Sequence, residues 1–294
     1  MVNIQLSISL FIIFSLIVFV PNLIHKYIDM AAGEPLIVKG EEIKELPNST
    51  KSSSFSIDNK NVNYYNKTSA TGYLAYPIIE NNSKNLTEKK LPGIVMIHEW
   101  WGLNENIKNM ANSLAKEGYV VLAVDLYNGQ VTDSADIART LVSNVRNNPS
   151  EAISNLQSAV RYLASLEHVN SSKIASLGWC FGGGQSLQLA LNTDPEHPLA
   201  ATIIYYGNLV TDQESISKIK WPVLGIFGDQ DQSISVNDVK IFEKMLTSIG
   251  IPNEIYIYEG VGHAFANPSG DNYAPKETAD AWQKTLDFLN KYTK

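Results

Sequence analysis

The alternation of short apolar runs with amphipathic segments constrains the fold of this chain more than any other feature. Runs such as Ile94 to Ile97 and Tyr119 to Val124 are continuously apolar, which is typical of strands buried on both faces. Between them, Asn104 to Lys116 repeats its apolar residues with helical spacing. Strands that alternate with helices predict an α/β fold, with a mostly parallel central sheet and helices on both faces.

The other expected elements continue this order along the chain. We predict strands at residues 62–65, 71–76, 94–97, 119–124, 173–178, 200–206, 222–227 and 254–258. We predict helices at residues 104–116, 134–166 with an interruption near 147–149, 181–191, 236–249 and 274–292. In parallel sheets the chemistry lies on loops beyond the carboxyl ends of the strands, so catalytic residues are expected there.

The loop after the expected strand 173–178 has the sequence of a nucleophile elbow. Cys180 lies between Gly178 and Gly182, and a helix is expected to begin at Phe181. This turn is so tight that the residues two before and two after the nucleophile must be small. The start of a helix also favours the thiolate form of a cysteine. A glycine-rich turn with a buried cysteine is the alternative; a phosphate loop is disfavoured, because its Lys-Ser/Thr pair is absent.

Two later loops supply an acid and a histidine. Asp231 follows the strand 222–227 and is preferred to Asp229 as the acid, with an Asx turn as its alternative role. His263 follows the strand 254–258, and the order nucleophile, acid, histidine is that of α/β-hydrolases. We therefore predict a triad of Cys180, His263 and Asp231 that forms an acyl-enzyme. The oxyanion would need backbone N–H donors from Phe181 and from the loop after the strand 94–97.

Several short blocks resemble the signature sequences of the dienelactone hydrolase family, also called carboxymethylenebutenolidases. The blocks are HEWWG, VDLY, GWCFGG, GDQD and GHAF, and they occur in family order within residues 61–294. The resemblance implies the same triad and an α/β-hydrolase fold. It also implies that Glu99 contacts the nucleophile in the resting enzyme and helps to form the thiolate, and that the N–H groups of Trp100 and Phe181 form the oxyanion hole. Burial beside two tryptophans would raise the pKa of Glu99, although capping of the following helix is its alternative role.

One position departs from the family pattern. Where dienelactone-cleaving members carry an arginine that helps to bind the substrate carboxylate, this chain has Asn267 and no cation nearby. A neutral ester or lactone therefore fits at least as well as a carboxylated dienelactone. We expect Trp101, Tyr127, Phe265 and Asn267 to line the substrate pocket, although core packing is the alternative for each aromatic ring.

The first 32 residues differ in character from the rest of the chain. Leu6 to Val20 is almost continuously apolar, and its length lies between a signal-peptide core and a full membrane span. We predict a signal or membrane-anchor segment at residues 1–32, a polar linker at 33–60 and the hydrolase domain at 61–294. The protein would be membrane-anchored or exported, with its orientation left open. A buried core helix is the alternative for the apolar run.

Composition disfavours several other functions. A formal net charge of −7 without a cluster of Lys and Arg argues against nucleic acid as a partner. The single cysteine has no second thiol to resolve an oxidised form, and the histidines lack metal-ligand spacing, so we expect no metal or other cofactor. The expected partner is a small-molecule ester, lactone or thioester, and the expected state is a monomer. The competing hypothesis is a catalytically inactive, membrane-anchored binding protein that retains the fold.

Overall fold

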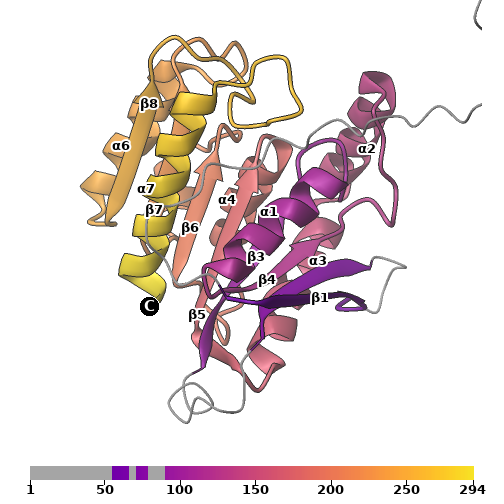
Figure 1. Cartoon of the computed structure of the whole chain (residues 1–294). Helices are drawn as coiled ribbons and strands as arrows, with labels where there is room; N and C mark the ends of the chain where they lie inside the picture. The colour runs from indigo at the N-terminus through magenta and orange to yellow at the C-terminus, as the bar shows by residue number, and fades with distance from the viewer. Residues whose placement is uncertain (1–54, 66–70, 79–89) are drawn as a thin grey trace, which may run out of the picture. The chain divides into compact units, whose positions relative to one another are not determined.

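The computed structural model describes residues 55–65, 71–78 and 90–294, whose strands form one eight-stranded sheet (Figure 1). The strands are β1 (Ile57–Val62), β2 (Gly72–Pro77), β3 (Leu91–Ile97), β4 (Val120–Val124), β5 (Val169–Trp179), β6 (Ala201–Tyr205), β7 (Val223–Gly228) and β8 (Asn253–Tyr258). The helices are α1 (Glu105–Lys116), α2 (Ala135–Asn147), α3 (Pro149–Ser165), α4 (Phe181–Leu191), α5 (Gln213–Ile216), α6 (Val236–Ser248) and α7 (Pro275–Thr293).

The sheet has the strand order β1-β2-β4-β3-β5-β6-β7-β8. The pairs from β4 through β8 are parallel, whereas β1 with β2 and β2 with β4 are antiparallel. Each parallel connection passes through a helix, as the alternating sequence pattern predicts. The predicted α/β fold with a mostly parallel sheet is therefore confirmed.

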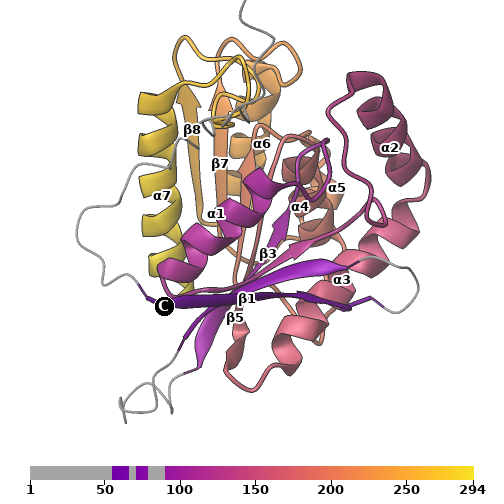
Figure 2. The ribbon, with the colours of Figure 1, turned by 45° about the vertical axis from the view of Figure 1, so that its right-hand side comes forward.

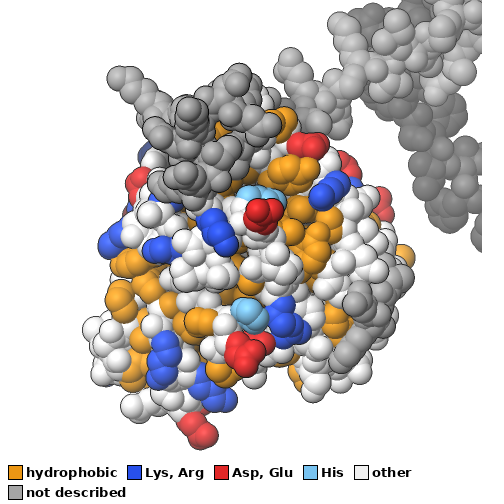
Figure 3. Space-filling view, turned by 90° about the horizontal axis from the view of Figure 1, so that it is seen from below, with side chains coloured by type: hydrophobic (Ala, Val, Ile, Leu, Met, Phe, Trp, Pro, Cys, Tyr) orange, Lys and Arg blue, Asp and Glu red, His pale blue; other side chains and the backbone are white. Residues whose placement is uncertain are grey.

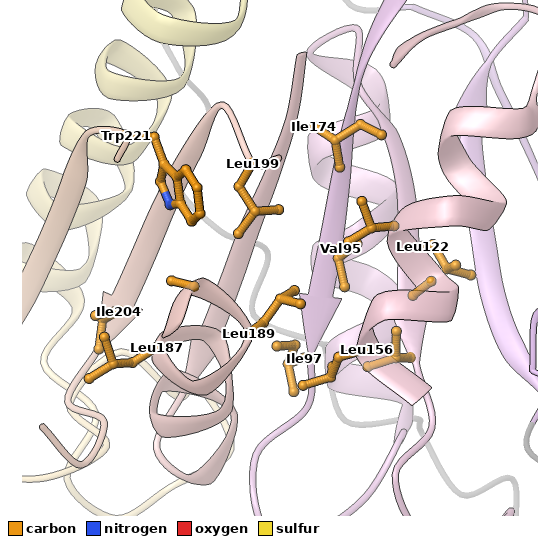
Figure 4. Packing of buried hydrophobic residues seen from close by; sticks show 14 of the residues in the cluster. Val95, Ile97, Leu122, Leu156, Ile174, Leu187, Leu189, Leu199, Ile204 and Trp221 are labelled. Atoms are coloured by element: carbon orange, nitrogen blue, oxygen red, sulfur yellow. The ribbon is translucent and has the colours of Figure 1, made fainter. Parts of the chain in front are cut away.

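Helices cover both faces of the sheet (Figures 1 and 2). α1 and α7 pack on one face, and α3, α4 and α6 pack on the other, while α2 lies beyond α3. The alternation of side chains along β3 divides the core accordingly. Val95 and Ile97 point toward α3 and α4 (Figure 4), and Ile94 and Met96 point toward α1. Because both faces are buried, the strand had to be apolar without interruption.

The first strand lies earlier than predicted. β1 begins at Ile57, so the last residues of the expected linker belong to the sheet, and the strand predicted at 62–65 is wrong except for its first residue. Residues 58–61 of this edge strand are exposed and polar, which gives them the composition of a linker. The short helix α5 was also not predicted.

The expected signal or anchor segment, residues 1–32, lies outside the described residues. Within the described part of the chain, the helices are too short or too polar to span a bilayer. On the face shown in Figure 3, basic and acidic side chains are interspersed among neutral and apolar ones.

Candidate active site

The carboxyl ends of the parallel strands bring the predicted polar residues to one edge of the sheet. Glu99 follows β3, Cys180 follows β5, Asp231 follows β7 and His263 follows β8. β3 pairs with β5, and β7 pairs with β8, both in parallel register, so their last residues lie at the same level. The loops that carry the candidate residues therefore meet, although they are far apart in the sequence.

Cys180 occupies a strained turn between β5 and α4. Its backbone angles are φ 55° and ψ −119°, a left-handed φ that residues other than glycine rarely adopt. A Cβ atom at Gly178 would lie 2.1 Å from the carbonyl oxygen of Gly182, and one at Gly182 would lie 2.3 Å from that of Ile97. Both glycines are thus required, the first by the turn and the second by the close approach of α4 to the end of β3.

A continuous chain of hydrogen bonds joins three of the predicted residues. Nε2 of His263 lies 3.1 Å from Sγ of Cys180, and Nδ1 of His263 lies 2.8 Å from Oδ2 of Asp231. The other carboxylate oxygen of Asp231 accepts the backbone N–H groups of Ser233 and Ile234, at 2.7 and 3.1 Å. Asp231, which is 7% exposed, is therefore fixed against the imidazole.

The rival acid candidate, Asp229, has a different structural role. Its Oδ1 accepts the backbone N–H of Gly260 at 2.7 Å, which ties the end of β7 to the turn after β8. Of the two aspartates, Asp231 is the one bonded to His263, as predicted.

The imidazole of His263 is stabilised in its protonated form. Burial alone would lower the pKa of His263, but its hydrogen bonds to Asp231 and Cys180 raise the value to about 10. Burial has the opposite effect on Asp231 and would raise its pKa, yet the hydrogen bonds from His263 and from the backbone hold this pKa below its ordinary value. The hydrogen bonds to Asp231 and Cys180 therefore favour the protonated form of this imidazole.

Glu99 lies beside this chain in a nearly water-free position. It is 4% exposed, and burial raises its pKa to about 7, opposed by the charge of His263. Its Oε2 accepts a hydrogen bond of 2.7 Å from Nδ2 of Asn267, which is 7% exposed. The expected contact with Cys180 is replaced by this one: among the described residues, the side-chain hydrogen bond of Glu99 is to Asn267, and that of Cys180 is to His263.

His98, one residue before Glu99, has a structural role. It is fully buried, its Nδ1 lies 2.5 Å from the carbonyl oxygen of Glu99, and its Nε2 accepts the N–H of Leu126 at 3.2 Å. Both ring nitrogens are used to connect the loop after β3 to the loop after β4, so His98 holds the backbone of Glu99 in place.

Comparison with known proteins identifies the family. The model of the dienelactone hydrolase family matches residues 80–293. The chain belongs to the dienelactone hydrolase family. A relative from Saccharolobus solfataricus, named "Putative carboxymethylenebutenolidase", is 32% identical over 235 residues, which cover 68% of this chain and 90% of the relative. Protein usf of Aquifex pyrophilus is 30% identical over 206 residues, covering 68% of this chain and 88% of that protein.

A solved structure agrees on the fold of this dienelactone hydrolase family member. The dienelactone hydrolase-like promiscuous phosphotriesterase from metagenomic libraries superimposes with a TM-score of 0.71 at 22% identity, covering 81% of this chain and 99% of that one. The chain is accordingly an α/β-hydrolase and a hydrolytic enzyme, as the sequence predicts.

The predicted oxyanion-hole donors of the hydrolase lie on neighbouring segments. Phe181 is the first residue of α4, and Trp100 opens the turn after β3. Within the described residues, neither backbone N–H donates to a backbone carbonyl. The close packing of Gly182 on the carbonyl oxygens of Ile97 and His98 brings the two segments together. Their role as oxyanion donors stays a prediction.

The aromatic residues near the site divide into surface and core. The rings of Trp100 and Trp101 lie 4.5 Å apart and are partly exposed. Phe265, by contrast, is fully buried and packs against Tyr206 and Tyr258, so its expected place in the substrate pocket is wrong. The backbone after His263 turns inward and directs this ring into the core beneath α7.

Sequence reasoning missed Tyr206. This fully buried residue follows β6, and its ring meets that of His263 edge to face at 5.2 Å between centroids. Its φ of 34° is a second left-handed value in the site. Its position directly after a parallel strand was the signal that could have identified it.

Two small cavities adjoin the apolar cluster against which Cys180 packs. Each has a volume of about 200 Å³; Phe181 lines one and Tyr127 lines the other, and Val145 of α2 lines both. Tyr127 and Phe181 belong to that cluster, with ring centroids 5.7 Å apart. Tyr127 thus lines a cavity, although it is only 3% exposed. Its place in the substrate pocket stays a prediction.

Proposed function

We propose that this hydrolase cleaves a small ester, lactone or thioester through a thiolate on Cys180. The supporting observation is the hydrogen-bond chain from Cys180 through His263 to Asp231, with contacts of 3.1 and 2.8 Å. The raised pKa of His263, about 10, favours transfer of the thiol proton to the imidazole before substrate arrives.

The chemistry then follows in two halves. The thiolate of Cys180 attacks the carbonyl carbon, and the resulting oxyanion is bound by the N–H groups of Trp100 and Phe181. The bond to the leaving oxygen or sulfur breaks as His263 gives that atom its proton, which leaves a thioester on Cys180. His263, now neutral, takes a proton from water while the water oxygen attacks the thioester. The carbon–sulfur bond breaks, the acid is released, and the thiolate–imidazolium pair is restored.

The residue at position 267 favours an uncharged acyl group. At position 267 the chain has an amide, and this amide is already bonded to Glu99. We therefore propose that position 267 takes no part in binding a substrate carboxylate.

Replacement of the nucleophile tests the proposal. We expect Cys180→Ala to lower kcat/KM for p-nitrophenyl acetate by about 10⁴-fold or more, since loss of the nucleophile removes the covalent route. His263→Ala should have a similar effect, and His197→Ala, in a loop far along the chain from β8, is the matched control with activity retained. A Cys180→Ala enzyme with near wild-type activity would end the proposal.

A further inference from the structure

The side chain of Asn267 connects two segments that are 168 residues apart. Its Nδ2 donates to Oε2 of Glu99 at 2.7 Å, and its Oδ1 accepts the backbone N–H of Ser269 at 2.9 Å. Because the amide oxygen is occupied by Ser269, the amide nitrogen has to face Glu99. The residue is 7% exposed, so this orientation is fixed inside the protein.

The position of the Glu99 carboxylate matters because of what surrounds it. Cys180, His263 and Tyr206 are the titratable groups that interact with it or share its environment. An ionised carboxylate that moved to the sulfur would repel a thiolate and would compete for the imidazolium proton. Burial raises the pKa of Glu99 to about 7, so both its neutral and its ionised form are present near neutral pH. The ionised form is stabilised by a hydrogen-bond donor other than Cys180 and His263.

We propose that Asn267 is a positioning residue that supplies this partner. Its amide holds the Glu99 carboxylate apart from Cys180, so that His263 alone receives the thiol proton and the ion pair forms without substrate. The inference rests on the proposed function, since it takes Cys180 as the nucleophile. It differs from substrate binding by Asn267, because here the residue acts only through Glu99.

The pH dependence of thiol alkylation tests the inference without any ester. Iodoacetamide reacts with the thiolate, and the rate measured from pH 5 to pH 10 gives an alkylation midpoint. We expect Asn267→Ala to raise this midpoint by about one pH unit, which is about a tenfold loss of thiolate below the midpoint. Glu99→Gln and the double variant should share one midpoint, because an uncharged amide at position 99 neither repels the thiolate nor takes up its proton, whether or not Asn267 holds it.

Two further variants keep the test decisive. Asn267→Asp has the same shape and can still accept the N–H of Ser269, but it presents an oxygen to Glu99, so it should raise the midpoint as Asn267→Ala does. Asn155→Ala is the matched control, because it removes a buried amide, 4% exposed, that donates to the carbonyl of Asp125. It should leave the midpoint unchanged.

The results that would overturn this inference differ from those that would overturn the proposed function. An unchanged or lowered midpoint in Asn267→Ala and Asn267→Asp overturns the inference, and so does a shift that persists in the Glu99→Gln background. A higher KM for the ester with no shift would assign Asn267 to substrate binding instead. If Cys180→Ala retained ester hydrolysis, the proposed function would fail, but the alkylation midpoints would still report whether Asn267 acts on the sulfur.

Discussion

Replacement of Glu99 with glutamine should stabilise the protein, and only at neutral and alkaline pH. Burial raises the pKa of Glu99 from its ordinary value of 4.5 to about 7, so between these values the folded state binds more protons than the unfolded state. The free energy of unfolding must then fall as the pH rises from 4.5 to about 7. At about 1.4 kcal/mol per pH unit, the loss is about 3 kcal/mol. Glutamine does not ionise and can still accept the N–H of Asn267, so Glu99→Gln avoids this loss.

Urea unfolding at a series of pH values measures the effect. The difference in unfolding free energy between Glu99→Gln and wild type should be constant below pH 4.5, increase by about 3 kcal/mol toward pH 7.5, and then level off. Glu105→Gln is the matched control: the Glu105 side chain is 80% exposed and pairs with Lys108, so its difference should stay within about 0.5 kcal/mol. If the Glu99→Gln curve ran parallel to wild type, burial would not raise the pKa of Glu99 as described above.

Two other matched pairs test the packing of the site by the same unfolding measurement. Gly178→Ala should lower the free energy of unfolding by about 3 kcal/mol, because the new Cβ would lie 2.1 Å from a backbone oxygen. At Gly184 the nearest atom to a new Cβ is 3.4 Å away, so Gly184→Ala should raise the free energy of unfolding by up to about 1 kcal/mol through helix propensity. Tyr64→Phe should lower the free energy of unfolding by about 1–3 kcal/mol, because its buried hydroxyl donates to Oδ1 of Asn155 and accepts the N–H of Asp125. Tyr127→Phe should change it by less than about 0.5 kcal/mol, because the buried hydroxyl of Tyr127 has no hydrogen-bond partner among the described residues. Equal costs within either pair would contradict the packing described.

The nucleophile turn could be predicted because its geometry requires particular residues. A strand that turns sharply into a helix needs small residues on both sides of the turning residue, and this requirement is local enough to be visible in Gly178 and Gly182. The predicted helix at 181–191 coincides with α4 for the same reason. Strands such as β3 and β4 were also predictable, since burial on both faces requires unbroken apolar runs.

The edge of the sheet was less predictable. In β1 the residues Asp58 to Asn61 are all exposed, so no alternation of apolar and polar side chains marks them as a strand. What makes them a strand is the antiparallel pairing with β2, in which Ile57 lies opposite Pro77 and Val62 opposite Gly72. Pairing is a property of two segments together, and the sequence of one segment does not contain it.

The same distinction explains the candidate site. Cys180, Asp231 and His263 could be identified because each follows a parallel strand, and the carboxyl ends of parallel strands share one edge of the sheet. The partner of Glu99 follows from no such rule: Asn267 reaches it only because the turn after β8 directs residue 265 into the core and residue 267 back toward β3. The same backbone turn therefore explains why Phe265 lies in the core and why Asn267 is hydrogen-bonded to Glu99. Loops that present chemistry can be located from sequence, but the side chains that hold this chemistry in place depend on backbone turns that only the folded chain defines.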